Sequence, residues 1–292
     1  MPDNVLIVIP ARYQSTRLPG KPLALINGVP MIERVARIAG AVCRATPGCS
    51  LVVATDHQFI LDFCKGKNIP AVMTSETCKS GTERCLEAAD KTGSEARFIV
   101  NLQGDNPLCP PRIVQALIDA WIAADERGGG DVADVFTPAV KLTWDEYDRL
   151  LAQKQTTPHS GTTVTVAHNG NALYFSKAVI PSIRKKEQAM RTFPASPVRR
   201  HIGLYAYTRS ALERYFAFEA EGRLSEYEQS SVEALEQLRF LYNGMTVRVI
   251  DVEYRGRKTM SGVDSPEDVK RAEEILNEFG ELELELHPED AR

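Results

Sequence analysis

The 292-residue sequence contains no apolar run that approaches the roughly 20 residues a bilayer-spanning helix requires. Its N-terminus is acidic and leads directly into an apolar strand pattern, unlike a signal peptide. We therefore expect a cytoplasmic protein without a membrane partner.

The sequence also lacks a basic surplus. It holds 35 basic and 39 acidic residues, for a formal net charge of −4. Such a chain cannot displace many counterions from a phosphate backbone, so nucleic acid is not an expected partner. Hydrophobic residues make up 43% and charged residues 25%, which is ordinary for a folded globular protein.

Paired metal or redox cysteines are missing too. No Cys-x-x-Cys occurs, and no histidine stands at metal-ligand spacing from a cysteine. We expect reduced, mostly buried thiols. The six cysteines are Cys43, Cys49, Cys64, Cys78, Cys85 and Cys109.

The common phosphate-binding motifs are absent, yet a cationic loop stands where a ligand would bind. Residues 5–9 form an apolar, β-branched run closed by a proline, as in a buried parallel strand. The loop that follows carries Arg12, Arg17 and Lys21, the hydroxyl of Ser15 and a glycine, but fits neither a P-loop nor a dinucleotide fingerprint. Arginine forks and a lysine suit a polyphosphate. An ordinary solvated loop is the alternative for two arginines alone. The full string resembles the signature loop of sugar-nucleotide transferases, and this resemblance favours a nucleotide.

Alternating strand and helix patterns predict an α/β fold with a mainly parallel sheet. Besides residues 5–9, strands are expected at 51–55, 71–74 and 98–102, and helices at 31–38, 58–66 and 113–124. The chain is long enough for one large domain or a domain with a smaller lobe.

Two short stretches extend the candidate site. Ser80, followed by Glu83, predicts a helix N-terminus with a capping box, whose amides can also hold a base or a phosphate. Asp105 follows a glycine at the end of the strand at 98–102. It is either a turn residue or a magnesium ligand.

The second half has a different pattern. Residues 143–161 are predicted to be an irregular surface excursion, and 182–199 a mobile loop. Strands at 162–166 and 172–175 flank a hairpin turn. A strand at 199–207, a helix at 226–243, a strand at 247–252 and a final helix after Ser265 are expected.

His201 and Tyr205 lie in the predicted strand at 199–207. A histidine there is commonly a satisfied core residue, but together with Arg200 it can neutralise an acidic ligand. Glu233 and Gln237 are expected to share a face of the predicted helix at 226–243.

Eight blocks of the chain together resemble the 3-deoxy-manno-octulosonate cytidylyltransferases, also called CMP-sugar-acid synthetases. The blocks are residues 11–23, 53–57, 80–84, 103–105, 173–177, 200–205, 235–239 and 262–268. The resemblance implies a Rossmann-like nucleotide-diphospho-sugar transferase fold, with a mixed, mainly parallel sheet and a smaller antiparallel acceptor and dimerisation lobe. It also implies a homodimer that transfers CMP from CTP to a sugar acid with Mg²⁺ and releases pyrophosphate, as in lipopolysaccharide biosynthesis.

By position, the resemblance assigns roles to individual residues. Catalysis would involve Arg12, Lys21 and Asp105, and Mg²⁺ would be held by Asp105 and Asp264. Nucleotide binding would use Ala11, Arg12, Ser15, Thr16, Arg17, Lys21, Ser80, Gly81, Thr82 and Gln103. The acidic acceptor would contact Arg84, His201, Tyr205, Glu236 and Gln237.

Three departures from the family pattern concern the acceptor. Asn106 stands where the family usually has glutamate, Thr165 where it has lysine, and Ser230 and Ser231 lie in a segment that is usually more charged. They leave an 8-amino octulosonate or a phosphonate such as phosphonoformate as alternative acceptors. A non-catalytic nucleotide-binding protein is the alternative of another class.

The expected organisation is a single cytidylyltransferase domain over residues 1–276. Its CTP-binding half would be residues 1–130 and its acceptor-binding and dimerisation half residues 131–276. Residues 277–292 would form an acidic tail.

Overall fold

The structure is a computed structural model that describes residues 4–15, 17–128, 132–258, 260, 262–282 and 286. It divides into two compact units. The first unit comprises the described residues within 1–119, 204–213 and 254–292, and the second comprises those within 120–203 and 214–253. The predicted division at residue 130, into a CTP-binding half and an acceptor-binding half, concerns function and not compactness, and it stays a prediction.

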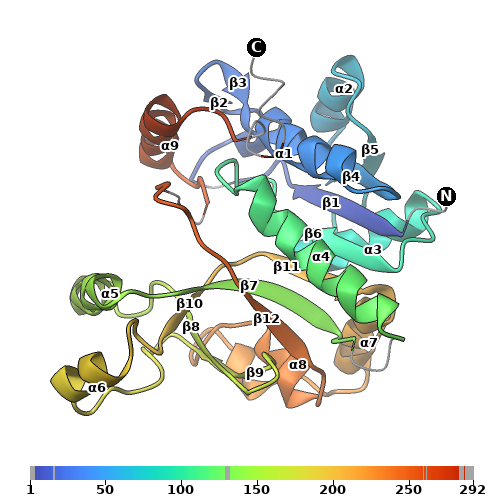
Figure 1. Ribbon diagram of the computed structural model, residues 1–292. Coiled ribbons are helices and arrows are strands. Elements are labelled where there is room, and N and C mark those ends of the chain that lie inside the picture. Colours follow the sequence, from blue (N-terminus) through green and yellow to red (C-terminus); the bar gives the residue numbers. More distant parts are fainter. Residues whose placement is uncertain are drawn as a thin grey trace. The chain divides into compact units, whose positions relative to one another are not determined.

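The first unit contains a mainly parallel sheet in the order β5-β4-β1-β6-β11 (Figure 1). Within this sheet, β5, β4, β1 and β6 run parallel, and β11 runs antiparallel to β6. Its elements are β1 (Val5–Ala11), η1 (Lys21–Leu23), β2 (Leu25–Ile26), β3 (Val29–Pro30), α1 (Met31–Ala45), β4 (Cys49–Thr55), α2 (Gln58–Gly66), β5 (Ala71–Met73), α3 (Gly81–Lys91), β6 (Phe98–Asn101), β11 (Tyr205–Thr208) and α9 (Pro266–Phe279).

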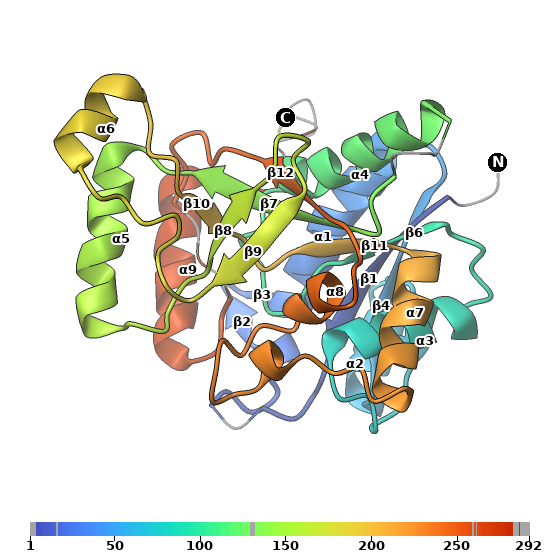
Figure 2. The same cartoon turned by 90° about the horizontal axis from the view of Figure 1, so that it is seen from below.

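The order of these strands creates a switch point between β1 and β6. The chain steps outward from β1 to β4 and β5, and then returns to β6 on the other side of β1. Right-handed crossovers in opposite directions place α1 and α3 on opposite faces of the sheet (Figure 2). Ligands of such sheets bind at the carboxyl ends of the strands beside this point.

Apolar side chains explain why the central strands form. Residues 5–9 are all buried, and Ile7, Val8 and Ile9 have no exposed surface. Strand β1 pairs in parallel register with β4 over its whole length and with β6 over its first four residues. A strand covered on both faces favours such a continuous apolar run, so the sequence-based assignment of β1, β4, β5 and β6 is confirmed.

The second unit is built around a mostly antiparallel sheet. Strand β7 pairs in parallel with β12 and antiparallel with β10, and β10, β8 and β9 continue the antiparallel pairing (Figure 2). Its elements are β7 (Val135–Lys141), α5 (Trp144–Thr156), β8 (Thr163–Val166), β9 (Ala172–Ser176), α6 (Lys186–Thr192), β10 (Arg199–His201), η2 (Glu226–Glu228), α8 (Leu238–Tyr242) and β12 (Val247–Asp251). Helices α4 (Pro111–Glu126) and α7 (Arg209–Ala220) contain the unit boundaries. The predicted hairpin is confirmed as β8 and β9.

Four sequence-based assignments in the second half are wrong. Residues 143–161 contain α5, which begins with a capping box between Thr143 and Glu146. Residues 182–199 contain α6, and the strand expected at 199–207 is two strands, β10 and β11, in different units. The helix expected at 226–243 is reduced to η2 and α8, so Glu233 and Gln237 do not share a helical face.

None of the described helices is long and apolar enough to cross a membrane. All six cysteines lie within the described ranges, and no disulfide bond joins any of them.

Candidate active site

The cationic loop after β1 closes with a sharp reversal at Gly20. This residue adopts a left-handed backbone conformation with φ of 65°, which a glycine reaches without steric cost. It precedes the short helix η1, whose first residue is Lys21. The Ser15 hydroxyl oxygen accepts a hydrogen bond from the Leu18 amide at 3.3 Å. The loop thus turns back on itself, and Lys21 returns toward the sheet.

A close backbone approach joins this loop to the end of β6. The Gly104 amide donates to the Pro10 carbonyl oxygen at 3.2 Å. A Cβ atom at position 104 would lie only 2.5 Å from that oxygen, so a larger residue would force the two strand ends apart. Asp105 therefore emerges directly beside the loop. The Val263 amide in turn donates to the Asp105 carbonyl at 2.8 Å, which brings the segment before α9 to the same place.

Four charged side chains meet where these three segments converge. Lys21 Nζ lies 2.7 Å from Asp105 Oδ2 and 3.0 Å from Asp264 Oδ1. Arg17 Nη2 lies 3.0 Å from Asp264 Oδ2. Burial opposes the charged form of Lys21, but Asp105 and then Asp264 outweigh it and raise the lysine pKa. Lys21 is therefore fully protonated at neutral pH and balances two carboxylates.

The two carboxylates fit a magnesium site of the kind that a nucleotide completes. They already share one cation, so both can face a single metal ion. Mg²⁺ commonly takes one or two carboxylates, together with water and substrate phosphates. Within the described ranges, no group of three or more His, Cys, Asp or Glu side chains is placed to hold a metal. The donor set of the described protein alone is thus small, and phosphate oxygens would have to supply the rest.

The N-terminus of α3 forms another edge of the site. Ser80 Oγ accepts from the Glu83 amide at 3.1 Å, which confirms the predicted cap. The capping box is only half formed, because the Glu83 carboxylate accepts from the Lys79 amide instead of the Ser80 amide. Gly81 is crowded by the Gln103 side chain, whose nearest atom would lie 3.1 Å from an added Cβ.

Gln103, Gly81 and Ser80 are therefore brought together as the sequence predicted, although their contact with a nucleotide stays a prediction. Gln103 is held by a hydrogen bond of 2.9 Å from its Nε2 to Asn101 Oδ1. Ala11 ends β1 and is buried, and Thr82 is buried with its hydroxyl 3.4 Å from Tyr207 Oη. Thr16 lies outside the described residues.

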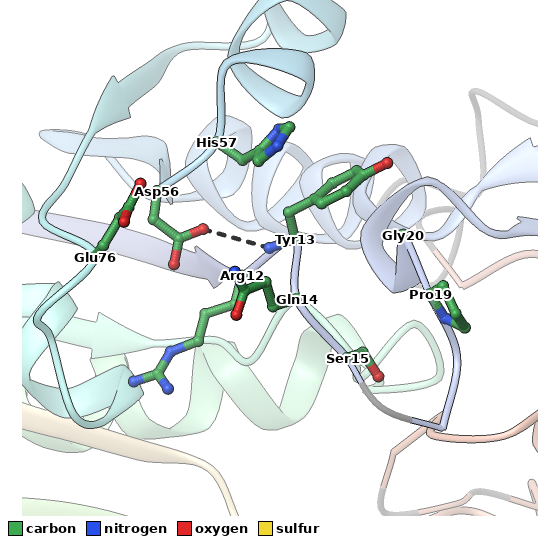
Figure 3. Close-up of a pocket in the computed structure, with 9 residues that line it drawn as sticks. All are labelled: Arg12, Tyr13, Gln14, Ser15, Pro19, Gly20, Asp56, His57 and Glu76. Carbon is green, nitrogen blue, oxygen red and sulfur yellow. Dashed lines mark hydrogen bonds between the residues drawn. The ribbon is translucent and has the colours of Figure 1, made fainter.

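A cavity of about 570 Å³ opens beside the cationic loop (Figure 3). Its lining residues are Arg12, Tyr13, Gln14, Ser15, Pro19, Gly20, Asp56, His57 and Glu76. The sequence analysis predicted roles for only Arg12 and Ser15 among them. The Arg12 guanidinium donates to the Cys78 carbonyl, and the ring of Tyr13 stacks on His57 with centroids 3.9 Å apart and an interplanar angle of 15°.

Asp56 was missed as a site residue, although a carboxylate directly after a parallel strand was a usable signal. Its partner Arg84 was predicted to bind the acceptor, but it has no exposed surface. The Arg84 guanidinium contacts Asp56 Oδ2 at 2.9 Å and Thr74 Oγ1 at 2.5 Å. Acceptor binding by Arg84 stays a prediction and would require this buried ion pair to open.

The predicted acceptor residues are divided between the units. Arg84 and Tyr205 belong to the first unit, and His201, Glu236 and Gln237 to the second. Tyr205 is buried, and its ring stacks on that of Tyr207 with centroids 6.2 Å apart. Gln237 is 2% exposed, and its buried Nε2 has no hydrogen-bond partner among the described residues. Such an amide group can donate to a bound ligand.

The surroundings of His201 favour its neutral form over the cation that the sequence suggested. Burial, and then the charge of Lys177, lower its pKa to about 3. Its Nε2 lies 2.8 Å from Thr137 Oγ1. The neutral ring can still exchange hydrogen bonds, but it contributes no charge at neutral pH.

The positive charge near His201 comes from lysines instead. Lys177 Nζ lies 3.3 Å from Thr162 Oγ1, and its backbone amide donates to Glu233 Oε2 at 2.6 Å. Burial first, and then Lys177 and Arg200, lower the pKa of Lys154, against a smaller effect of Glu233. Lys177 lies within one of the family blocks, but neither lysine was a predicted site residue.

Comparisons with known proteins agree with this geometry. The family model described as "Cytidylyltransferase" matches residues 6–248. The chain is 44% identical over 280 residues to the 3-deoxy-manno-octulosonate cytidylyltransferase of Maricaulis maris, covering 96% of this chain and 99% of that one. It is 37% identical over 286 residues to the enzyme of the same name from Porphyromonas gingivalis, again covering 96% and 99%.

A solved structure is similar over almost the same extent. It is titled as a CMP:2-keto-3-deoxy-manno-octonic acid synthetase complexed with CTP. The TM-score is 0.75 with 32% sequence identity, covering 94% of this chain and 98% of that one. This similarity confirms the predicted fold class.

Proposed function

The chain belongs to the cytidylyltransferase family, and from this premise we propose that it transfers CMP from CTP to 3-deoxy-manno-octulosonate and releases pyrophosphate. The observation that carries the proposal is the cluster of Lys21, Asp105 and Asp264 at the switch point between β1 and β6. This cluster places a protonated lysine and two carboxylates at the sheet edge where nucleotides bind.

The reaction joins an acceptor oxygen to the α-phosphorus of CTP. A hydroxyl of the sugar acid attacks in line and loses its proton to solvent, the bond between the α-phosphorus and the bridging oxygen breaks, and pyrophosphate carries away the electron pair. Lys21, Arg12 and Arg17 provide fixed positive charge for the triphosphate and for the charge that develops on the leaving group. This direct transfer requires no covalent nucleophile from the protein.

Mg²⁺ is part of the proposal, with Asp105 and Asp264 as its protein ligands. The metal would neutralise phosphate charge. The support is the orientation of both carboxylates toward one cation, together with the oxygen ligands that Mg²⁺ prefers.

The acceptor proposal is supported by a local cluster of positive charge around Lys154 in the second unit. Lys177 and Arg200 both lie close enough to Lys154 to lower its pKa beyond the effect of burial, and Glu233 opposes them with a smaller effect. A cationic cluster suits an acidic acceptor. The octulosonate relatives favour this sugar acid over an 8-amino analogue or a phosphonate.

A homodimer in the cytoplasm completes the proposal. In the second unit, Tyr227 makes edge contacts with Tyr174 and Tyr242, and Tyr242 is 55% exposed. Exposed aromatic clusters commonly mark contact surfaces. Sedimentation of the wild type and of Tyr242→Ser would test this: we expect a dimer that weakens in the variant, and a monomeric wild type would contradict it.

Pyrophosphate release with CTP and Mg²⁺ tests the main proposal. The acceptors compared at equal concentration would be 3-deoxy-manno-octulosonate, its 8-amino analogue and phosphonoformate. We expect robust release with the octulosonate and little with phosphonoformate. Release with phosphonoformate alone would keep the transfer chemistry but refute the acceptor. The absence of release with all three acids would refute the proposed reaction.

A further inference from the structure

Asp56 connects two parts of the nucleotide site. It follows β4, and its side chain is only 15% exposed. Oδ1 accepts a hydrogen bond from the Tyr13 backbone amide at 3.3 Å (Figure 3). Oδ2 accepts from Arg84 Nη2 at 2.9 Å. Tyr13 belongs to the cationic loop and Arg84 to α3, so a single carboxylate contacts both.

The Arg84 side of this connection is rigid. The Arg84 side chain is completely buried and is also bonded to Thr74. Removing one member of a buried ion pair leaves the other charge without compensation, which is strongly destabilising. The carboxylate of Asp56 is therefore fixed by the interior of the first unit, and its second oxygen is offered to the loop at a set position.

The Tyr13 side of the connection lies next to Arg12 in the chain. Tyr13 directly follows Arg12, whose guanidinium donates to the Cys78 carbonyl just before α3. The Tyr13 ring stacks on His57, and the His57 side chain accepts from the Phe59 amide at the start of α2. The backbone at Tyr13 thus holds the direction in which Arg12 leaves β1.

We propose that Asp56 is a positioning residue for nucleotide binding, which acts by holding the Tyr13 amide and, through it, Arg12. This inference rests on the proposed function and adds a residue to it. The geometry that Arg12 needs for the triphosphate is set before the nucleotide arrives, which lowers the ordering cost of binding.

Asp56→Asn separates this role from simple stabilisation. An amide side chain has one acceptor oxygen, whereas Asp56 must accept from two donors, so the variant loses one contact whichever way it turns. We expect the Kd for CTP, measured by calorimetry, and the KM for CTP to rise about tenfold, with kcat within about threefold of wild type. Asp62→Asn is the matched control, because Asp62 is an exposed aspartate on α2 that accepts a hydrogen bond from Gln58 Nε2 at 2.7 Å.

Arg84→Met supplies the structural comparison. It breaks the same ion pair but leaves the Asp56 carboxylate able to accept from Tyr13. We expect it to lower the melting temperature at least as much as Asp56→Asn, and to raise the Kd for CTP no more than Asp56→Asn does, because Asp56 is less firmly held but can still accept from Tyr13. A larger increase in Kd for Arg84→Met than for Asp56→Asn, or an Asp56→Asn variant that loses stability with an unchanged Kd, would overturn the proposal.

Two further measurements keep the outcomes distinct. If Asp56→Asn does not fold, Asp56→Glu retains both acceptor oxygens and displaces them by one methylene group. A smaller rise in Kd with an unchanged kcat is then expected, and an unchanged Kd would refute the role. Failure of the wild type to bind CTP would instead refute the proposed function.

Discussion

Two lysines, one in each unit, have pKa values shifted in opposite directions. Lys21 lies between Asp105 and Asp264, and these carboxylates raise its pKa despite partial burial. Lys154 is also partly buried, but its neighbours include Lys177 and Arg200, and its pKa is lowered. Lys154 Nζ donates to the carbonyls of Pro158 at 3.1 Å and Gly161 at 2.9 Å, and to that of Lys177.

The difference indicates how each unit is prepared for a charged ligand. In the first unit, the positive charge of Lys21 is already compensated by Asp105 and Asp264. A metal can therefore replace Lys21 as the partner of the two carboxylates, and a triphosphate can become the new partner of Lys21. In the second unit, clustered positive charge is held by neutral carbonyls and is only partly compensated, so an anion would be attracted directly. The following experiments test this contrast.

The largest effect is expected from Lys21→Met. Loss of a group that stabilises charge in a transition state typically lowers kcat about 10²- to 10³-fold. The measurement is steady-state pyrophosphate release at saturating CTP. Lys258→Met is the control, because Lys258 is 64% exposed and paired with Glu278 elsewhere in the first unit. A kcat within tenfold of wild type would contradict the proposed role of Lys21.

The same Lys21→Met variant should bind a divalent metal more tightly in the absence of nucleotide. Lys21 neutralises Asp105 and Asp264, so a metal must compete with its ammonium group. We expect the affinity for Mn²⁺, used as a spectroscopic substitute and followed by electron paramagnetic resonance, to increase about tenfold. An unchanged or weaker affinity would show that the two carboxylates do not bind metal together. Lys258→Met again serves as the control.

In the second unit, Lys177→Met should weaken acceptor binding without affecting CTP. Removing one member of the cationic cluster is expected to raise the KM for the sugar acid about tenfold and to leave the KM for CTP unchanged. Lys186→Met is the matched control, because Lys186 pairs with Asp148 instead of the cluster. Equal changes in both KM values would indicate a general structural effect.

The last expected effect concerns the pH dependence of stability. The pKa of His201 is about 3 in the folded protein, well below its ordinary value of 6.5, so between these pH values the unfolded state binds a proton that the folded state does not. The free energy of unfolding therefore falls as the pH decreases from about 6.5 toward 3, by at most about 1.4 kcal/mol per pH unit from this residue.

Urea unfolding at pH 7.5 and pH 5 checks this expectation. His201→Gln can keep a hydrogen bond to Thr137 but cannot titrate, so it should lose less stability than wild type on acidification. An equal loss in both proteins would show that His201 does not cause the pH dependence.

Several features of the first unit were predictable because their causes are local. The run at residues 5–9, the cap at Ser80 and the proline after Ser265 are each contained within a few residues, and all three assignments are confirmed. The missed helix α5 also had a local signal, because Thr143 and Glu146 have capping-box spacing. Its polar composition concealed the buried positions Trp144, Tyr147 and Leu150.

The helix wrongly expected at 226–243 shows where local reasoning ends. Glu233 accepts from Ser176 Oγ and from the Lys177 amide, both at 2.6 Å. Ala234 then adopts a left-handed conformation with φ of 53°. Contacts with the β8–β9 hairpin thus replace helical hydrogen bonds that the composition favours, because propensity differences are small compared with such interactions.

The sequence by itself determined which chemical groups stand beside which elements of the first unit. A cationic loop follows β1, an amide and a carboxylate follow β6, and a carboxylate precedes α9. Only the tertiary structure decided that Lys21 contacts Asp105, 84 positions away, and Asp264, 243 positions away. It alone identified Asp56 as the contact between Tyr13 and Arg84, and it made His201 neutral. The physical reason is that charge compensation and desolvation depend on which groups the fold brings within a few ångströms, and spacing along a chain does not specify those distances.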